Sequence, residues 1–306
     1  MLQPPDVRVG ITGARGMVGQ AVVARLRARG DEAVPIERGP EGWDPLRGFR
    51  DPQALSGLDA IVHLAGESVA GRWTAARREA ILTSRTVGTR TLVEAIASAR
   101  QPPRTLVSAS AVGYFGDRGD TELGDDATPG AGFLAEVASA WEQAAQAATA
   151  HGCRVVCLRL GMVLARHGGA LARLRPIFKA GMGGRLGGGQ QWVSWVHLDD
   201  VADAFLFALD HAELRGAFNL TAPGPVRNAE LTAALGRAWH RPAWMPAPGF
   251  MLGLVLGDMA REMLLAGQRV LPRGLQAAGF HFRYPQLDDA LAEVCADGPA
   301  LSRTAR

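Results

Sequence analysis

A short apolar segment near the start of the chain leads directly into three glycines spaced three residues apart. Residues 7–11 have the composition of a strand, and Gly13, Gly16 and Gly19 follow as helical periodicity begins. This order lets a pyrophosphate approach the backbone of a tight turn and meet the free N–H groups and the dipole of a helix. A second strand-like segment follows at residues 32–36. The pattern predicts dinucleotide binding, because a glycine-rich turn without a ligand leaves the fixed spacing unexplained.

Strand-like apolar segments alternate with longer amphipathic segments along much of the chain. Such alternation predicts an α/β fold with a doubly wound parallel sheet, covered by helices on both faces, that binds ligands at the carboxyl ends of its strands. The expected strands are residues 7–11, 32–36, 60–64, 105–108, 154–160 and 217–220, and the expected helices are residues 17–29, 74–99, 133–150, 199–211, 228–239, 249–267 and 286–294.

The amino-acid composition of the sequence changes after residue 165. Residues 181–189 are so rich in glycine that no regular element is expected there. We expect residues 1–165 to form a dinucleotide-binding domain, with residues 198–222 returning to the same sheet. Residues 166–197 and 223–306 then form a smaller, mostly helical lobe that binds the substrate.

Composition narrows the choice of partners. The chain has 306 residues, of which 47% are hydrophobic and 21% charged, as in ordinary globular proteins. Its net charge is +3, and the sequence has no run of basic residues interleaved with aromatic residues. Nucleic-acid binding is therefore not predicted. Cys153, Cys157 and Cys295 lack metal-ligand spacing and are interpreted as reduced thiols. Residues 250–256 are too few to span a bilayer. We therefore expect a cytoplasmic protein, monomeric or homodimeric, with a small-molecule substrate and no metal, nucleic-acid or membrane partner.

Further motifs carry a resemblance to a known superfamily. His63-Leu64-Ala65-Gly66 follows one expected strand, and the sequence of residues 108–114, Ser-Ala-Ser-Ala-Val-Gly-Tyr, occurs later. With the glycine turn, these motifs resemble the extended short-chain dehydrogenases/reductases, which implies a Rossmann fold. Additional motifs resemble the atypical epimerase family branch, whose C-terminal domain has no assigned role; the resemblance covers about residues 7–294 and implies no particular substrate. These motifs are Arg72-Trp73, Ser84-Arg85, Trp141-Glu142, residues 191–197 and residues 279–285.

The end of the second strand bears on the choice of cofactor. In this fold a carboxylate there accepts hydrogen bonds from the ribose of NAD, whereas arginine pairs with the 2′-phosphate of NADP. The chain has both in Glu37-Arg38, and Arg15 in the glycine turn adds a second cation. The resemblance implies a small polar residue followed by arginine, so Arg38 fits and Glu37 departs from the pattern. NADP(H) is predicted over NAD, with Glu37 interpreted as a solvated charge that points away.

Other cofactor contacts follow from position and from the resemblance. Residues 64–66 end a strand and should pass beneath the adenine-side ribose. The resemblance places Arg85 beside the cofactor, although a surface arginine is the alternative. Val163 either packs near the nicotinamide or fills the core. The predicted cofactor contacts are Gly13, Arg15, Gly16, Met17, Val18, Gly19, Glu37, Arg38, Leu64, Ala65, Gly66, Arg85, Ser108, Arg159, Gly161 and Val163.

The usual catalytic pair of the superfamily is absent. The resemblance implies a serine near a strand end and Tyr-x-x-x-Lys on the next helix, where the lysine lowers the pKa of the tyrosine for proton transfer. The chain has only two tyrosines, Tyr114 and Tyr284, and neither has this spacing to its single lysine. Alignment on Glu142, which the resemblance puts four residues after the lysine, places Leu134 and Ala138 at the tyrosine and lysine positions.

The remaining candidates for catalysis are Ser110 and Tyr114. Ser110 matches the superfamily serine, and either donates to a substrate carbonyl or is simply a small residue at a strand end. A phenol with a pKa of about 10 needs a neighbour to transfer protons at neutral pH, and the sequence identifies none for Tyr114. The predicted substrate contacts are Glu67, Arg72, Trp73, Trp192 and His197, with burial in the core as the alternative for the tryptophans and the histidine.

Two functions therefore stay open. The first is an NADP(H)-binding oxidoreductase or nucleoside-diphosphate-sugar-epimerase-like enzyme that lacks the usual Tyr-x-x-x-Lys pair and acts on a small carbonyl or sugar nucleotide. The alternative is a non-catalytic NADP(H)-binding protein that reports redox state to a partner. The retained Ser110 and the complete second lobe favour the enzyme.

Overall fold

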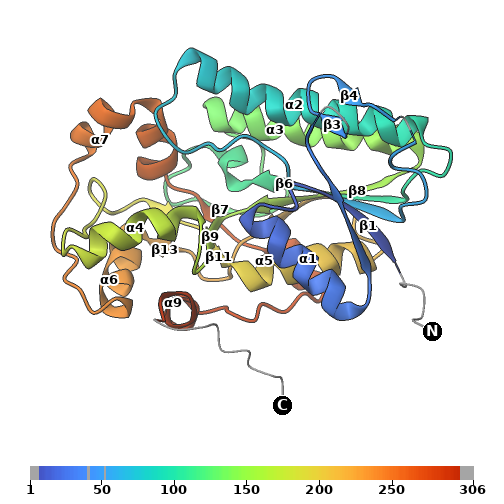
Figure 1. The fold of residues 1–306 in the computed structure, drawn as a ribbon. Coiled ribbons are helices and arrows are strands. Elements are labelled where there is room, and N and C mark those ends of the chain that lie inside the picture. The colour runs from blue at the N-terminus through green and yellow to red at the C-terminus, as the bar shows by residue number, and fades with distance from the viewer. Residues whose placement is uncertain (1–6, 40–41, 52, 297–306) are drawn as a thin grey trace.

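A six-stranded sheet forms the centre of the computed structural model, which describes residues 7–39, 42–51 and 53–296 (Figure 1). The strand order is β12-β8-β6-β5-β1-β2, and neighbouring strands are parallel. The α/β, doubly wound fold predicted from the sequence is thus confirmed. The strands are β1 (Arg8–Thr12), β2 (Glu32–Ile36), β5 (Ala60–His63), β6 (Thr105–Ala111), β8 (Arg154–Leu160) and β12 (Gly216–Leu220).

Helices cover both faces of this sheet (Figure 1). Helices α1 (Met17–Arg29) and α5 (Leu198–Asp210) pack on one face, and α2 (Ala75–Ser98) and α3 (Phe133–Gln146) on the other. Because both faces are covered, strands such as β5 are buried along their whole length. The helix expected over residues 133–150 ends earlier, because residues 147–151 tighten into a 3-10 turn.

The smaller lobe combines helices with short strand pairs. Its helices are α4 (Gly169–Lys179), α6 (Asn228–Ala238), α7 (Gly249–Leu256), α8 (Arg273–Ala277) and α9 (Leu287–Cys295). The short strand pairs of the chain are β9 (Met162–Leu164) with β11 (Trp195–His197), β10 (Trp192–Val193) with β13 (Val226–Arg227), β7 (Glu122–Leu123) with β14 (Arg269–Val270), and, beside the main sheet, β3 (Trp43–Asp44) with β4 (Gly48–Phe49).

Two helices of this lobe differ from the sequence-based prediction. The single helix expected over residues 249–267 is wrong, because Gly257 adopts a φ of +64° and ends α7, after which Ala260–Leu265 form a π-helical turn. Helix α4 was not predicted. Its buried Leu171 and Phe178 have helical spacing, but the surrounding glycines and arginines hide the pattern.

Glu262 fastens the π-helical turn to the sheet domain. Its carboxylate accepts hydrogen bonds from the backbone N–H groups of Phe133 at 3.1 Å and Leu134 at 2.9 Å. These are orphan donors in the first turn of α3, where the N-cap residue Gly132 has no side chain that could accept them. The contact places negative charge at the positive end of the helix dipole, so it both satisfies the donors and holds the two lobes together.

Candidate functional site

The glycine turn after β1 has the close packing that its sequence predicts. Gly13 has a φ of +69°, and Gly16 forms the N-cap of α1. A Cβ atom on Gly19 would lie 2.2 Å from the carbonyl oxygen of Gly13, so only glycine lets the helix approach the turn this closely. The first turn of α1 contains no acidic residue, and its N-cap has no side chain. This helix end therefore suits a bound anion.

A buried hydrogen-bonded cluster supports the turn from below. The Thr12 hydroxyl oxygen accepts from the backbone N–H groups of Leu64 and Ala65, at 3.1 and 3.2 Å, and lies 2.7 Å from Nδ1 of His63. Since that oxygen already accepts twice, its proton is donated to Nδ1, and the Nε2–H of His63 donates to the Thr89 hydroxyl at 3.0 Å. Burial, and then the charge of Arg85, lower the pKa of His63 to about 3. Neutral His63 thus joins β1 to β5, a role that the sequence analysis missed.

The charges at the expected 2′-phosphate position form an exposed pair. The Arg15 guanidinium lies 2.6 Å from the Glu37 carboxylate, and their side chains are 85% and 54% exposed. The interpretation of Glu37 as a charge pointing away is therefore wrong, because Glu37 turns toward the arginine of the glycine turn. Arg38 is also exposed, immediately after the end of β2.

Arg85 lies under the segment that follows β5. Its guanidinium donates to the carbonyl oxygens of Glu67 at 3.0 Å and Ile81 at 3.2 Å, and lies 4.9 Å from the Trp141 ring centroid. Burial lowers its pKa to about 10, and the charge of Glu67 partly opposes this shift. A Cβ on Gly66 would lie 3.1 Å from the guanidinium carbon. The alternative of a solvated surface arginine is thus wrong, and Arg85 supports the backbone of residues 66 and 67.

The expected substrate contacts near this segment differ in their exposure to solvent. Trp73 is only 9% exposed, donates its indole N–H to the Val69 carbonyl at 2.8 Å, and packs edge-on against Phe133. It is a core residue, which favours the buried alternative for Trp73 over the predicted stacking on a substrate. Arg72 beside it is exposed, and Glu67 pairs with Arg77 at 3.0 Å.

A buried charge cluster occupies the carboxyl ends of β6 and β8. The Ser110 hydroxyl donates to the Glu142 carboxylate at 2.6 Å, and Arg159 donates to both oxygens of that carboxylate at 2.8 and 2.9 Å. The third nitrogen of Arg159 donates to the Asp125 carbonyl at 2.9 Å. Arg159 is therefore held by bonds within the protein, and its cofactor contact stays a prediction. Ser110 lies inside β6. Its hydroxyl, a candidate donor to a substrate carbonyl, here donates a hydrogen bond to Glu142.

Tyr114 lies directly against this cluster. It belongs to the 3-10 turn Val112–Phe115, and the Arg159 guanidinium carbon is 3.7 Å from the centroid of its half-buried ring. Among the residues that the structure describes, none forms a hydrogen bond with its hydroxyl. A Cβ on Gly113 would lie 3.1 Å from the Cβ of Leu134, so this turn packs on the helix at the position where the superfamily has its tyrosine. Arg159 is thus the charged group next to the Tyr114 ring.

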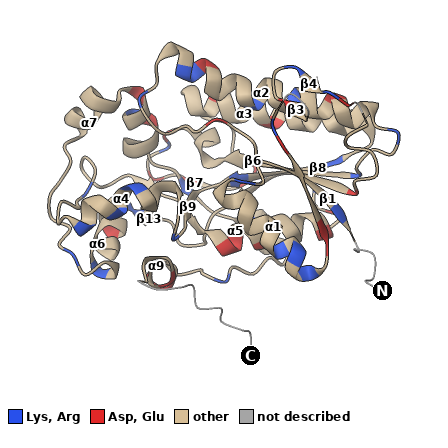
Figure 2. Ribbon diagram, in the orientation of Figure 1, with Lys and Arg blue, Asp and Glu red and all other residues tan. Residues whose placement is uncertain are grey.

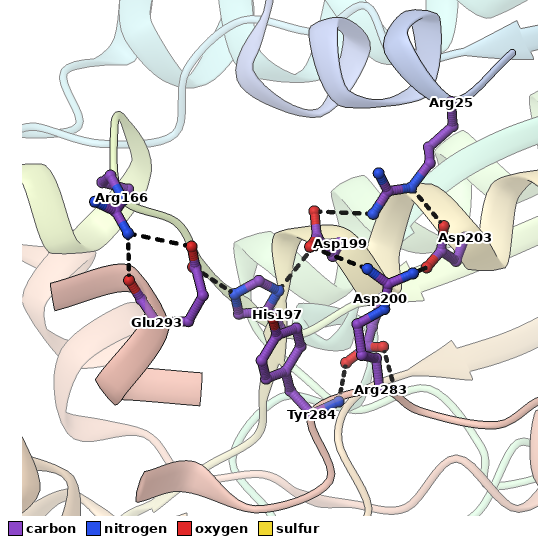
Figure 3. A network of polar contacts seen from close by, with 9 residues as sticks. All are labelled: Arg25, Arg166, His197, Asp199, Asp200, Asp203, Arg283, Tyr284 and Glu293. Atoms are coloured by element: carbon purple, nitrogen blue, oxygen red, sulfur yellow. Dashed lines mark hydrogen bonds and ion pairs between the residues drawn. The ribbon is translucent and has the colours of Figure 1, made fainter. Parts of the chain in front are cut away.

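His197 serves to connect elements (Figure 3). It forms the N-cap of α5, where its Nδ1 accepts from the Asp199 backbone N–H at 3.1 Å, and its Nε2 lies 3.1 Å from Glu293 of α9. Its ring packs on Tyr284 with a centroid distance of 3.9 Å. With both nitrogens bonded and the residue 2% exposed, the structure favours the buried alternative for His197 over the predicted substrate contact.

Trp192 differs from these buried aromatics because it is partly exposed. Its indole N–H donates to Asp120 at 2.8 Å, and the guanidinium carbons of Arg227 and Arg269 lie 4.1 and 4.6 Å from its ring centroid. Both arginines also have carboxylate partners, Arg227 in Asp120 at 2.6 Å and Arg269 in Glu122 at 3.3 Å, so the ring lies within a network of paired charges.

The remaining predicted cofactor residues lie around the turn or within the core. Met17 packs against the Gly168-Gly169 segment before α4, which the sequence analysis missed. Val18 and Leu64 are half-buried, whereas Ser108 is fully buried and its hydroxyl donates to the Ala109 carbonyl, so its cofactor contact stays a prediction. A Cβ on Gly161 would lie 2.5 Å from the Ser194 carbonyl oxygen, and Val163 pairs with Val196 between β9 and β11.

Within residues 7–39, 42–51 and 53–296, no group of three or more His, Cys, Asp or Glu side chains is arranged to hold a metal ion. Over the same residues, every helix is too short or too polar to cross a bilayer. The side chains of Cys153, Cys157 and Cys295 are buried.

Relatives of known name resemble the chain over nearly its full length. An epimerase family protein of Mycobacterium bovis is 41% identical over 290 residues, covering 92% of this chain and 96% of that protein. Epimerase family protein SDR39U1 of Bos taurus is 38% identical over 299 residues, covering 95% of this chain and 100% of the relative. A homologue in Arabidopsis thaliana, 37% identical, is described as chloroplastic.

Solved structures show the same fold. A crystal structure of human epimerase family protein SDR39U1 with NADPH superposes with a TM-score of 0.84 at 32% identity, over 94% of this chain and 99% of that one. A nucleoside-diphosphate sugar epimerase from Corynebacterium glutamicum superposes with a TM-score of 0.75 at 36% identity, over 94% of this chain and 58% of that one.

Family models account for both parts of the chain. A domain of unknown function (DUF1731) matches residues 247–294. The NAD dependent epimerase/dehydratase family matches residues 9–221, which include the glycine turn and the whole central sheet. With this match and the relatives above, the chain belongs to the NAD dependent epimerase/dehydratase family.

Proposed function

We propose that this protein binds NADP(H) and catalyses an oxidoreduction or an epimerase-type reaction on a small carbonyl compound or sugar nucleotide. The observation that carries the catalytic part is the position of Tyr114, with Arg159 against its ring, beside Leu134 at the vacant tyrosine position. The human relative solved with NADPH, at 32% identity, supports the choice of cofactor.

The residues of the glycine turn fit the cofactor. The N-terminus of α1, with neither acid nor capping side chain, would hold the pyrophosphate, and Arg15 and Arg38 would hold a 2′-phosphate. When bound, the nicotinamide ring supplies or accepts a hydride. The partly exposed ring of Trp192 would stack on a ring of the substrate.

The protein's own groups would then move the proton. The Tyr114 hydroxyl exchanges a proton with the reacting oxygen of the substrate. Arg159 packs its guanidinium against the ring, and Glu142 holds Arg159 in position. Ser110 fixes Glu142 through its hydroxyl, and therefore acts as a positioning residue.

Tyr114→Phe is expected to lower turnover roughly 100-fold to 10,000-fold, the usual contribution of a positioned acid/base group, and to leave NADPH affinity within about twofold. Turnover would be followed by nicotinamide absorbance against a panel of carbonyl compounds and sugar nucleotides, and affinity by fluorescence titration. Tyr284→Phe is the matched control, because Tyr284 packs on His197 at the base of α5. Unchanged turnover in Tyr114→Phe rejects the proposed role.

The Arg15→Ala and Arg38→Ala variants test the cofactor. Each is expected to weaken NADPH binding about tenfold or more while leaving NADH binding unchanged, since a charge-assisted hydrogen bond contributes about 1.5–3 kcal/mol. Glu37→Gln is expected to strengthen NADPH binding, because it releases Arg15 from its 2.6 Å pair. Arg237→Ala, which loses an exposed pair with Asp288, is the control. Equal losses for NADPH and NADH would mean that the 2′-phosphate lies elsewhere.

A non-catalytic sensor is the second candidate, and one observation favours it. Leu134 and Ala138 occupy the positions of the superfamily's catalytic tyrosine and lysine. The Ser110 hydroxyl donates its hydrogen bond to Glu142. Tight NADPH binding without turnover on any substrate of the panel would support the sensor, whereas turnover that depends on Tyr114 supports the enzyme.

A further inference from the structure

The end of the smaller lobe presents large apolar side chains to solvent. Every residue of α7 is at least partly exposed, although the helix is entirely apolar. Phe250 and Leu254 are each 77% exposed. Contiguous apolar surface of this kind usually marks an interaction site. We define the apolar tip as Trp244, Met245, Phe250, Met251, Leu254 and Val255.

A cationic segment runs beside the apolar tip. The backbone N–H of Met245 donates to the Gly183 carbonyl at 3.1 Å, and that of Ala247 donates to the Arg185 carbonyl at 2.9 Å, so the loop after α4 lies against the tip. Residues 166–192 contain five Arg or Lys residues and no Asp or Glu. In Figure 2, α4 carries blue Arg and Lys positions, and the ribbon of α7 carries no charged position. Arg173 and Arg185 are exposed.

Acidic groups near the tip are already engaged. Asp258 pairs with Arg78 at 3.3 Å and with Arg261 at 3.1 Å. Glu262 is bound to the N-terminus of α3. By contrast, residues 173–185 contribute the exposed cations Arg173 and Arg185 and contain no carboxylate.

We propose that the apolar tip and its neighbouring cations bind the surface of an anionic lipid bilayer. Apolar side chains inserted at the headgroup boundary, flanked by arginine, are the features that bind such surfaces. A second copy of this chain is disfavoured, because an isologous contact through α7 would bring two cationic segments together. The eight residues of α7 are too few to span a bilayer, so the contact is interfacial. This inference stands apart from the proposed function and revises the expectation that the protein has no membrane partner.

Flotation of the full chain with vesicles tests the proposal. Binding is expected to vesicles of phosphatidylcholine mixed with phosphatidylserine, to fall as salt rises, and to be weak with phosphatidylcholine alone. Replacing both Arg173 and Arg185 with alanine is expected to weaken binding about 25-fold, since each cation near the surface contributes about 1 kcal/mol, or about fivefold. The double variant Phe250→Ser/Leu254→Ser is expected to weaken it at least tenfold.

The control variants remove an apolar side chain and a cation from surfaces away from the apolar tip. Leu46→Ser removes an apolar side chain that is 62% exposed in the sheet domain, and Arg100→Ala removes an exposed cation at the end of α2. Both are expected to leave vesicle binding unchanged. The proposal is overturned by absent binding to anionic vesicles, by equal losses in the control variants, or by a concentration-dependent dimer that Phe250→Ser/Leu254→Ser abolishes in the absence of lipid.

Discussion

Glu142→Ala is expected to destabilise the folded protein by about 3–5 kcal/mol, the usual cost of removing one partner from a buried ion pair. The side chains of Arg159 and Glu142 are only 5% and 11% exposed, so the remaining guanidinium would stay charged and largely without solvent. Ser110 would also lose its acceptor. The measurement is the free energy of unfolding from urea denaturation, compared at equal m-value with the unaltered protein.

Two comparisons isolate the effect of the buried charge. Arg237→Ala breaks an ion pair whose side chains are 64% and 74% exposed, and is expected to cost less than about 1 kcal/mol. The double variant Glu142→Leu/Arg159→Met, which removes both charges at similar volume, is expected to recover most of the stability lost in Glu142→Ala. A loss below about 1 kcal/mol in Glu142→Ala would show that Arg159 finds water or another partner.

Acid is expected to destabilise the protein steeply through His63. The pKa of His63 is lowered from 6.5 to about 3 by burial and by Arg85, so the unfolded chain binds a proton between these values and the folded protein does not. Its contribution to stability is complete above pH 6.5 and is lost as pH falls toward about 3, by about 1.4 kcal/mol per pH unit. Urea denaturation at a series of pH values across this window measures the slope.

His63→Gln is the variant that separates this group from the carboxylates. Glutamine does not titrate, so the slope below pH 6.5 should decrease by about one proton, although stability at neutral pH also falls because the bonds to Thr12 and Thr89 are altered. His151→Gln removes an exposed histidine and should leave the slope unchanged. An identical slope in His63→Gln and the unaltered protein would contradict the neutral state assigned to His63.

Local features of the sequence predicted the framework well. The turn from β1 into α1 depends on Gly13, Gly16 and Gly19, and all the residues that make it are neighbours in the chain. The core strands were found because burial on both faces requires continuous apolar runs. Helix α4 was not predicted, because its apolar positions lie among glycines and arginines.

The roles of polar side chains could not be predicted in the same way. The sequence predicts no partner for Glu142, and it predicts a cofactor contact for Arg159, which pairs with Glu142 in the structure. The two meet because β8 lies beside β6 and α3 packs over both strands. Likewise, His197 was a candidate for substrate binding until α9 brought Glu293 to its ring.

The sequence by itself determined the βαβ unit, the glycine turn and the family, because these are written in the composition and spacing of short continuous segments. Only the tertiary structure decided which charges are paired inside the protein and which face solvent. Ion pairs such as Arg159 with Glu142 depend on strand order and helix packing, which bring together residues from separate segments of the chain. The same packing leaves α7 exposed, with the Arg185 loop bonded to the segment that precedes the helix.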